Sequence, residues 1–115
     1  MPDPAEWARA YALTQLIEVP VYLYAARRLP PAKRWIFALG ASTLTHPALW
    51  YLFPWPDDPE AAGGYLTVTV IGELWVFLTE SLWGMVLRVP RPWLWSFIAN
   101  AASFAAGLTV NALLK

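Results

Sequence analysis

One stretch of the chain decides its fold class: YLTVTVIGELWVFLTESLWGMVLRV, residues 65–89. An α-helix needs about 20 apolar residues to cross the ~30 Å hydrocarbon core of a bilayer, and this stretch is long enough. It also contains Glu73 and Glu80, whose spacing places them on one face of a helix. An apolar helix with two acids on one face predicts a membrane span that turns this face toward other protein segments.

The composition of the whole chain also indicates a membrane protein. Of the 115 residues, 58% are hydrophobic and 14% are charged, whereas soluble domains have about 45–50% apolar and about 25% charged residues. So few charges cannot cover the surface of a small soluble monomer, and the apolar content excludes disordered and collagen-like chains. Cysteine is absent, which excludes a disulfide framework and a thiolate metal site.

Three further apolar stretches accompany the first. We predict transmembrane helices over residues 7–26, 35–53, 65–89 and 93–114, within a single domain that spans residues 1–115. The connections are short, so sequence neighbours are expected to run antiparallel. The expected fold is therefore all-α, a polytopic membrane protein with four transmembrane helices in an antiparallel bundle.

The charges outside the spans predict the orientation. Basic residues concentrate in loops 27–34 and 88–92. The charged residues of the loop between the second and third spans are all acidic: Asp57, Asp58 and Glu60. By the positive-inside rule, both basic loops face the cytoplasm and both termini lie outside. Acids precede the first span and arginines follow it, the reverse of a signal peptide, so we expect this span to be retained. The predicted location is the bacterial inner membrane, with multiple passes.

Ionisable side chains inside the predicted spans are the candidate functional residues. An ionisable residue at the centre of a span costs about 2.5–3.5 kcal/mol, so we expect these groups to face one another, water or a partner chain. Together with a polar residue on a matching helix face, the candidate ligand- or ion-binding set is Glu18, His46, Glu73, Glu80 and Asn100. A second set is expected to pack and hydrogen bond the helices: Ser42, Thr45, Ser103, Gly107 and Asn111.

Counting residues from the ends of the spans divides the buried groups into two layers. The outer-to-central layer is expected to contain Glu18, His46 and Glu73. The layer nearer the cytoplasm is expected to contain Ser42, Glu80 and Asn100. The simplest arrangement for the histidine is a neutral imidazole that hydrogen bonds to a carboxylate. Alternatively, the three residues of the outer layer have the right ligand types for a divalent transition metal, and no other cofactor is expected.

The sequence leaves three functional hypotheses open. In the favoured one, the buried cluster binds or translocates a proton, a cation or a small polar solute. In the second, the same residues only hydrogen bond the helices of a structural or accessory subunit of a larger membrane complex. The third is a membrane-embedded enzyme that uses the acids and His46. It is not favoured, and we assign no catalytic residue, because the sequence contains no G-x-S-x-G, H-E-x-x-H or phosphate-binding glycine motif.

Chain size and charge predict the partners. Four helices enclose little volume, so we expect a homo-oligomer, or docking on a larger membrane complex, within the lipid bilayer. The basic residues form no exposed cluster, so we expect no nucleic-acid partner.

Three short motifs carry a resemblance to a group of proteins. They are Thr45-His46-Pro47, the segment from Glu73 to Glu80, and Ser96-x3-Asn100-x2-Ser103-Phe104-x2-Gly107. Together they resemble a pattern in small uncharacterised prokaryotic four-helix membrane proteins, and the resemblance covers most of the chain. It implies no activity. The place of Glu18 is also similar to that of the glutamate in the first helix of small multidrug transporters, a likeness of architecture alone.

Overall fold

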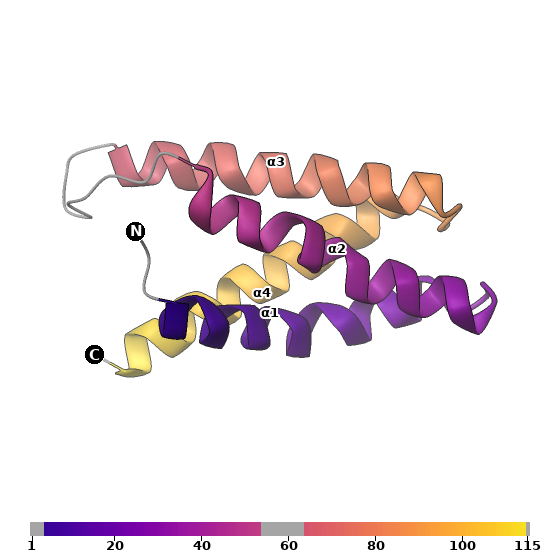
Figure 1. The fold of residues 1–115 in the computed structure, drawn as a ribbon, viewed down its shortest axis with the longest axis horizontal. Coiled ribbons are helices and arrows are strands. Elements are labelled where there is room, and N and C mark those ends of the chain that lie inside the picture. The colour runs from indigo at the N-terminus through magenta and orange to yellow at the C-terminus, as the bar shows by residue number, and fades with distance from the viewer. Residues whose placement is uncertain (1–3, 54–63, 115) are drawn as a thin grey trace.

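The computed structural model describes residues 4–53 and 64–114, apart from the side chains of residues 65, 111 and 114. Figure 1 shows its four α-helices: α1 (Pro4–Ala25), α2 (Pro31–Tyr51), α3 (Gly64–Val86) and α4 (Pro92–Leu114). The all-α, four-helix fold expected from the sequence is confirmed. Each helix has 21 to 23 residues and is therefore about 32–35 Å long.

The four helices form an up-and-down bundle. α1 and α3 each pack against α2 and α4, whereas the backbones of the two diagonal pairs, α1 with α3 and α2 with α4, do not approach closely in the described parts of the chain. In Figure 1, the start of α1 and the end of α4 lie at the same end of the bundle, which we call the terminal end. The short α1–α2 and α3–α4 connections lie at the opposite end, which we call the loop end.

The distribution of side chains is the reverse of that in a soluble bundle. Large apolar residues cover the outer surface, where Leu16 and Val86 are 73% exposed and Leu113 is 80% exposed. Acidic residues lie inside, where Glu18 and Glu80 are only 2% exposed. An outer surface of this kind is typical of a bundle that contacts an apolar environment or other protein.

Within the described residues, two helices are by themselves long and apolar enough to cross a membrane. The segments are Leu66–Val86 of α3 and Pro92–Val110 of α4. α1 and α2 have the necessary length but are less apolar. α1 contains the charged residues Glu6, Arg9 and Glu18, and α2 has Lys33 and Arg34 near its start and contains the polar residues Ser42, Thr43, Thr45 and His46. By length and composition alone, the described residues thus contain two candidate membrane spans.

Small residues and two aromatic rings close the loop end. The Tyr22 and Phe37 rings pack with their centroids 4.8 Å apart. They belong to a buried cluster that is otherwise made of small side chains: Ala25, Ala26, Ala38, Ala41, Val89 and Ala99. Alanines allow helix backbones to approach closely, so the loop end of the bundle is densely packed.

The α3–α4 connection places arginines at positions that favour glycine. The Val89 N–H donates to the carbonyl of Gly84 and the Arg88 N–H to that of Met85, which is the Schellman pattern of a helix end. Arg88 has a φ of 62°, and Arg91 has a φ of 49°. Since this left-handed conformation costs a non-glycine residue roughly 1–2 kcal/mol, the loop end carries two positive charges at some expense in stability.

Two helical glycines differ in the space around them. A Cβ atom at Gly40 of α2 would lie 2.9 Å from the ring of Trp83. The Trp83 indole N–H donates to the carbonyl of Phe37 at 3.3 Å, which holds this ring against α2. A Cβ atom at Gly107 of α4, in contrast, would meet nothing within 4 Å. Gly40 therefore permits a close α2–α3 contact, whereas Gly107 borders open space.

We predict opposite effects when a methyl group is added at these two glycines. Gly40→Ala should lower the free energy of unfolding by about 1–3 kcal/mol, because the Trp83 ring cannot move away without losing its contacts. Gly107→Ala should raise it by about 0.5–1 kcal/mol, because alanine is the better helix former. Thermal unfolding of the detergent-solubilised protein measures both changes. Similar changes in the two variants would contradict the close α2–α3 contact.

Candidate functional site

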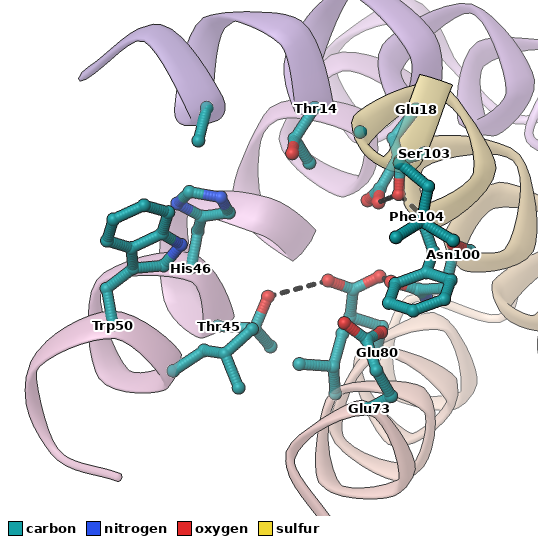
Figure 2. A pocket seen from close by; sticks show the side chains of 15 residues that line it. Thr14, Glu18, Thr45, His46, Trp50, Glu73, Glu80, Asn100, Ser103 and Phe104 are labelled. Atoms are coloured by element: carbon teal, nitrogen blue, oxygen red, sulfur yellow. Dashed lines mark hydrogen bonds between the residues drawn. The ribbon is translucent and has the colours of Figure 1, made fainter. Parts of the chain in front are cut away.

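A cavity of about 220 Å³ lies between the four helices. It is lined by every residue of the predicted binding set: Glu18, His46, Glu73, Glu80 and Asn100. Three of the predicted packing residues line it too: Thr45, Ser103 and Gly107. Figure 2 shows these side chains approaching the same space from all four helices. The fold thus brings together predicted residues that are up to 89 positions apart in the sequence, Glu18 and Gly107.

Glu80 of α3 connects all four helices through one carboxyl group. The Tyr22 hydroxyl of α1 donates to its Oε1 atom, and the Thr45 hydroxyl of α2 lies 2.6 Å from its Oε2 atom. Asn100 of α4 donates from Nδ2 to Oε1 at 3.0 Å. The same amide group also donates to the carbonyl of Ser96 at 2.8 Å, which fixes its orientation. The expected proximity of Glu80 and Asn100 is therefore observed.

Glu18 of α1 forms a second junction between helices. Ser42 of α2 donates to its Oε1 atom at 2.9 Å, and the Ser103 hydroxyl of α4 lies 2.6 Å from its Oε2 atom. The residue count grouped Ser42 with Glu80 by depth, but the carboxyl group to which Ser42 donates is that of Glu18. Ser42 and Thr45 stand three positions apart on α2, and the first turns toward α1 while the second turns toward α3.

The hydroxyl groups of Thr45 and Ser103 each have a second acceptor. The Thr45 Oγ1 atom lies 3.1 Å from the carbonyl of Ala41, and the Ser103 Oγ atom lies 3.2 Å from the carbonyl of Asn100. A hydroxyl has one hydrogen and two lone pairs. It therefore donates either to a carboxylate, or to the backbone while it accepts a hydrogen bond from a protonated carboxyl group. Each acid can thus be charged or neutral and keep this contact.

His46 of α2 is 8% exposed, yet its Nδ1 atom has no hydrogen-bond partner within the described residues. Aromatic rings surround the imidazole, with centroid distances of 5.4 Å to Tyr11, 5.9 Å to Trp50 and 6.2 Å to Trp7. The hydrogen bond expected between His46 and a carboxylate is not formed, because rings from α1 and α2 pack around the imidazole. One polar atom of His46 is therefore buried without a partner at the edge of the cavity.

Glu73 of α3 differs from the other two acids. It is partly buried and lines the cavity. Hydrogen bonds from side chains act on Glu18 and Glu80, whereas none from the described residues acts on the Glu73 carboxyl group. In Figure 2, Glu73 lies across the cavity from His46 and Trp50. Two groups with unused capacity for hydrogen bonds therefore face the cavity from two helices.

The metal site proposed from the sequence has no matching arrangement of ligands among the described residues. Among the His, Asp and Glu residues of the described ranges, no group of three is placed to hold a metal ion. Glu18 has both carboxyl oxygens engaged by Ser42 and Ser103, and rings surround His46. We therefore derive no metal chemistry from Glu18, His46 and Glu73.

Some predictions change or lie outside the described residues. Gly107 was expected to pack helices, but a Cβ atom there would meet nothing within 4 Å, so this glycine borders space instead of a neighbouring helix. The predictions for the Asn111 side chain and for the acidic loop residues Asp57, Asp58 and Glu60 lie outside the described residues.

Sequence reasoning did not select Tyr22 and Trp50 as site residues. Tyr22 donates to Glu80, and Trp50 packs on His46 and lines the cavity. A signal for both was present, since Tyr22 stands four positions after Glu18 and Trp50 stands four positions after His46. Residues with this spacing are neighbours on a helix face.

Comparisons with known proteins add no assignment. No family model, no curated protein and no solved structure matches this chain. The cavity and the side chains that line it are therefore what indicates a function.

We predict that the buried acids differ in their contribution to stability. Glu80→Ala should lower the free energy of unfolding by about 2–4 kcal/mol, because three interhelical hydrogen bonds worth about 0.6–1.7 kcal/mol each lose their acceptor. Glu73→Ala should lower it by less than about 1 kcal/mol, because no side-chain hydrogen bond is lost. Denaturant unfolding in detergent measures both, and Glu80→Gln, which keeps one acceptor oxygen, should be intermediate. If Glu80→Ala and Glu73→Ala lowered the free energy of unfolding equally, Glu80 would not hold the helices together more strongly than Glu73 does, which would contradict our interpretation.

Proposed function

We propose that this chain is an integral membrane protein whose four helices all cross the bilayer, and that its cavity binds a small cation. The packing supports four spans, because α1 lies against α4 and α2 against α3. A bilayer that surrounds α3 and α4 therefore also surrounds α1 and α2, which are long enough to cross it. On their outer faces, Leu16 of α1 and Leu44 of α2 are exposed, as lipid contact requires.

The proposed orientation places the loop end in the cytoplasm and both termini outside, in a bacterial inner membrane. Six of the eight basic residues belong to the loop end: Arg27, Arg28, Lys33, Arg34, Arg88 and Arg91. Arg34 also donates to the carbonyls of Arg27 and Leu29 at 3.1 Å, so its guanidinium group is fixed at this end of the bundle. Such an excess of positive charge is typical of cytoplasmic loops.

The free carboxyl group of Glu73 is the observation that carries the proposed binding function. The cavity contains three acids and is lined by no Lys or Arg of the described residues. Glu18 and Glu80 already interact with donor side chains, whereas no donor side chain within residues 4–53 and 64–114 does so with Glu73. A carboxyl group at membrane depth without a protein partner favours a functional role, and its natural ligand is a cation that neutralises it.

The proposed route to the cavity begins at the terminal end. A hollow of about 530 Å³, which we call the outer hollow, is lined there by charged residues of α1, Glu6 and Arg9, together with Leu13 and residues of α2 and α4. The loop end is closed by the Tyr22–Phe37 cluster. A cation therefore enters from outside, and its passage to the cytoplasm requires this cluster to open.

A structural role is the second candidate function, and it is favoured by the hydrogen bonds of Glu18 and Glu80. Glu18 connects α1 to α2 and α4, and Glu80 connects α3 to α1, α2 and α4, as the residues of a structural subunit would. The two roles concern different residues, because Glu73 makes no such connection. Assembly with copies of itself or with a larger complex remains a prediction.

We predict that single cysteines at the two ends react from opposite sides of the membrane. The natural chain has no cysteine, so Leu29→Cys at the loop end and Ala5→Cys at the terminal end give clean reporters. A membrane-impermeant maleimide added to intact spheroplasts should label Ala5→Cys and leave Leu29→Cys unlabelled until the membrane is opened. Labelling of both positions in intact spheroplasts would contradict four spans with this orientation.

We also predict a preference for cations within the cavity. Thr14 lines the cavity, and its neighbour Leu13 lines the outer hollow, so Thr14→Cys and Leu13→Cys are matched reporters. We compare two small thiol reagents that match in size and fit the cavity: 2-aminoethyl methanethiosulfonate, which is a cation at neutral pH, and 2-hydroxyethyl methanethiosulfonate, which is uncharged. The ratio of cationic to uncharged labelling rates should be about tenfold higher for Thr14→Cys than for Leu13→Cys, because the Glu73 carboxylate attracts the cation.

The control for this experiment neutralises the proposed ligand group. Adding Glu73→Gln to Thr14→Cys should reduce the rate ratio to that of Leu13→Cys. Equal ratios at the two cysteines, or a ratio that Glu73→Gln leaves unchanged, would contradict cation binding at Glu73.

A further inference from the structure

We propose that ligands reach the cavity through a waist formed by Ala10, Trp50 and Gly107, and that this waist selects them by size. The inference rests on the proposed function, because it concerns the route to the same cavity. These three residues line both the 220 Å³ cavity and the outer hollow. Two spaces that share lining residues from α1, α2 and α4 are neighbours, and the side chains at the shared positions separate them.

The residues of the waist differ greatly in bulk. Gly107 has no side chain, and a Cβ atom there would meet nothing within 4 Å. Ala10 contributes a single methyl group. Trp50 is therefore the one large side chain at the waist, and its indole ring forms the partition between the outer hollow and the cavity. Motion of this ring, or a larger residue at Gly107, changes the width of the passage.

The position of Trp50 depends on His46. Their rings are stacked, with centroids 5.9 Å apart and planes inclined by 28°. Trp50 stands near the end of α2, and helical side chains tilt toward the start of their helix, so its indole ring reaches from the terminal end toward the cavity. In Figure 2, Trp50 and His46 lie together at one side of the cavity. The imidazole thereby positions the partition, which accounts for its place among aromatic rings.

The cavity volume limits the ligand that passes the waist. A buried cavity of about 150 Å³ accommodates benzene, so the 220 Å³ of this cavity corresponds to a ligand of roughly nine non-hydrogen atoms by the same proportion. Larger molecules enter only the outer hollow. The waist therefore separates small solutes, which reach Glu73, from larger ones.

The test narrows the waist and follows the labelling of the two neighbouring cysteines. Gly107→Ala, Gly107→Leu and Gly107→Phe are each combined with Thr14→Cys and with Leu13→Cys. The probe is methyl methanethiosulfonate, which is uncharged, so its reaction does not depend on cation binding. The matched control is Ala105→Phe, an equally bulky change at an exposed position of α4 that lines neither space.

We expect the labelling rate of Thr14→Cys to fall progressively from Ala to Leu to Phe at position 107, by more than tenfold for Phe. The rate of Leu13→Cys should stay within twofold, and Ala105→Phe should affect neither cysteine. An unchanged rate for Thr14→Cys, or an equal fall for both cysteines, would overturn the proposal. In the opposite direction, Trp50→Ala should allow benzyl methanethiosulfonate to label Thr14→Cys at least tenfold faster, and no increase would contradict Trp50 as the partition.

The two proposals fail in different ways. A missing cation preference at Thr14→Cys contradicts binding at Glu73, whatever the effect of Gly107→Phe on the uncharged probe. A clear cation preference together with an unchanged rate in Gly107→Phe contradicts only the waist.

Discussion

The carboxyl group of Glu80 accepts hydrogen bonds from α1, α2 and α4, and the interior of the bundle is arranged around it. In the bilayer that we propose around the helices, lipid is as apolar as their leucines, so apolar burial does not determine which helix faces meet. Hydrogen bonds between buried polar groups can make that choice. Glu80 fixes the rotation of α3 relative to the other helices, and Glu18 does the same for α1 against α2 and α4.

This constraint also explains how three acids share one interior. Ionised carboxyl groups in a single cavity repel one another, and each is expensive at membrane depth. The hydroxyl groups of Thr45 and Ser103 relieve this cost, because each of them can serve a charged or a neutral acid. Glu18 and Glu80 thus accept the hydrogen bonds that hold the helices together. Glu73 is left with a free carboxyl group in the wall of a cavity, which is where we place the function.

The sequence predicts the helices and the membership of the site, but not the partners within it. Helix number and polar faces follow from apolar length and from the 3.6-residue period, which are local properties of the chain. The choice between Glu18 and Glu80 as the partner of Ser42 depends on the rotation of α2 against two neighbours, which no local pattern contains. The environment of His46 depends likewise on Trp7 and Tyr11 of another helix. Gly107 was misassigned because a small residue has the same local signature beside a cavity as in a helix contact.

The central claim is that Glu73 faces a space open to solvent while Glu18 and Glu80 are engaged by the protein. Water-edited solid-state NMR tests it most directly, on protein reconstituted in lipid and labelled with 13C at the glutamate carboxyl groups. Glu→Gln variants at the three positions assign the signals. Our account predicts rapid magnetisation transfer from water to the Glu73 carboxyl carbon and slow transfer to those of Glu18 and Glu80. Equal transfer to all three, or slower transfer to Glu73 than to Glu80, would contradict it.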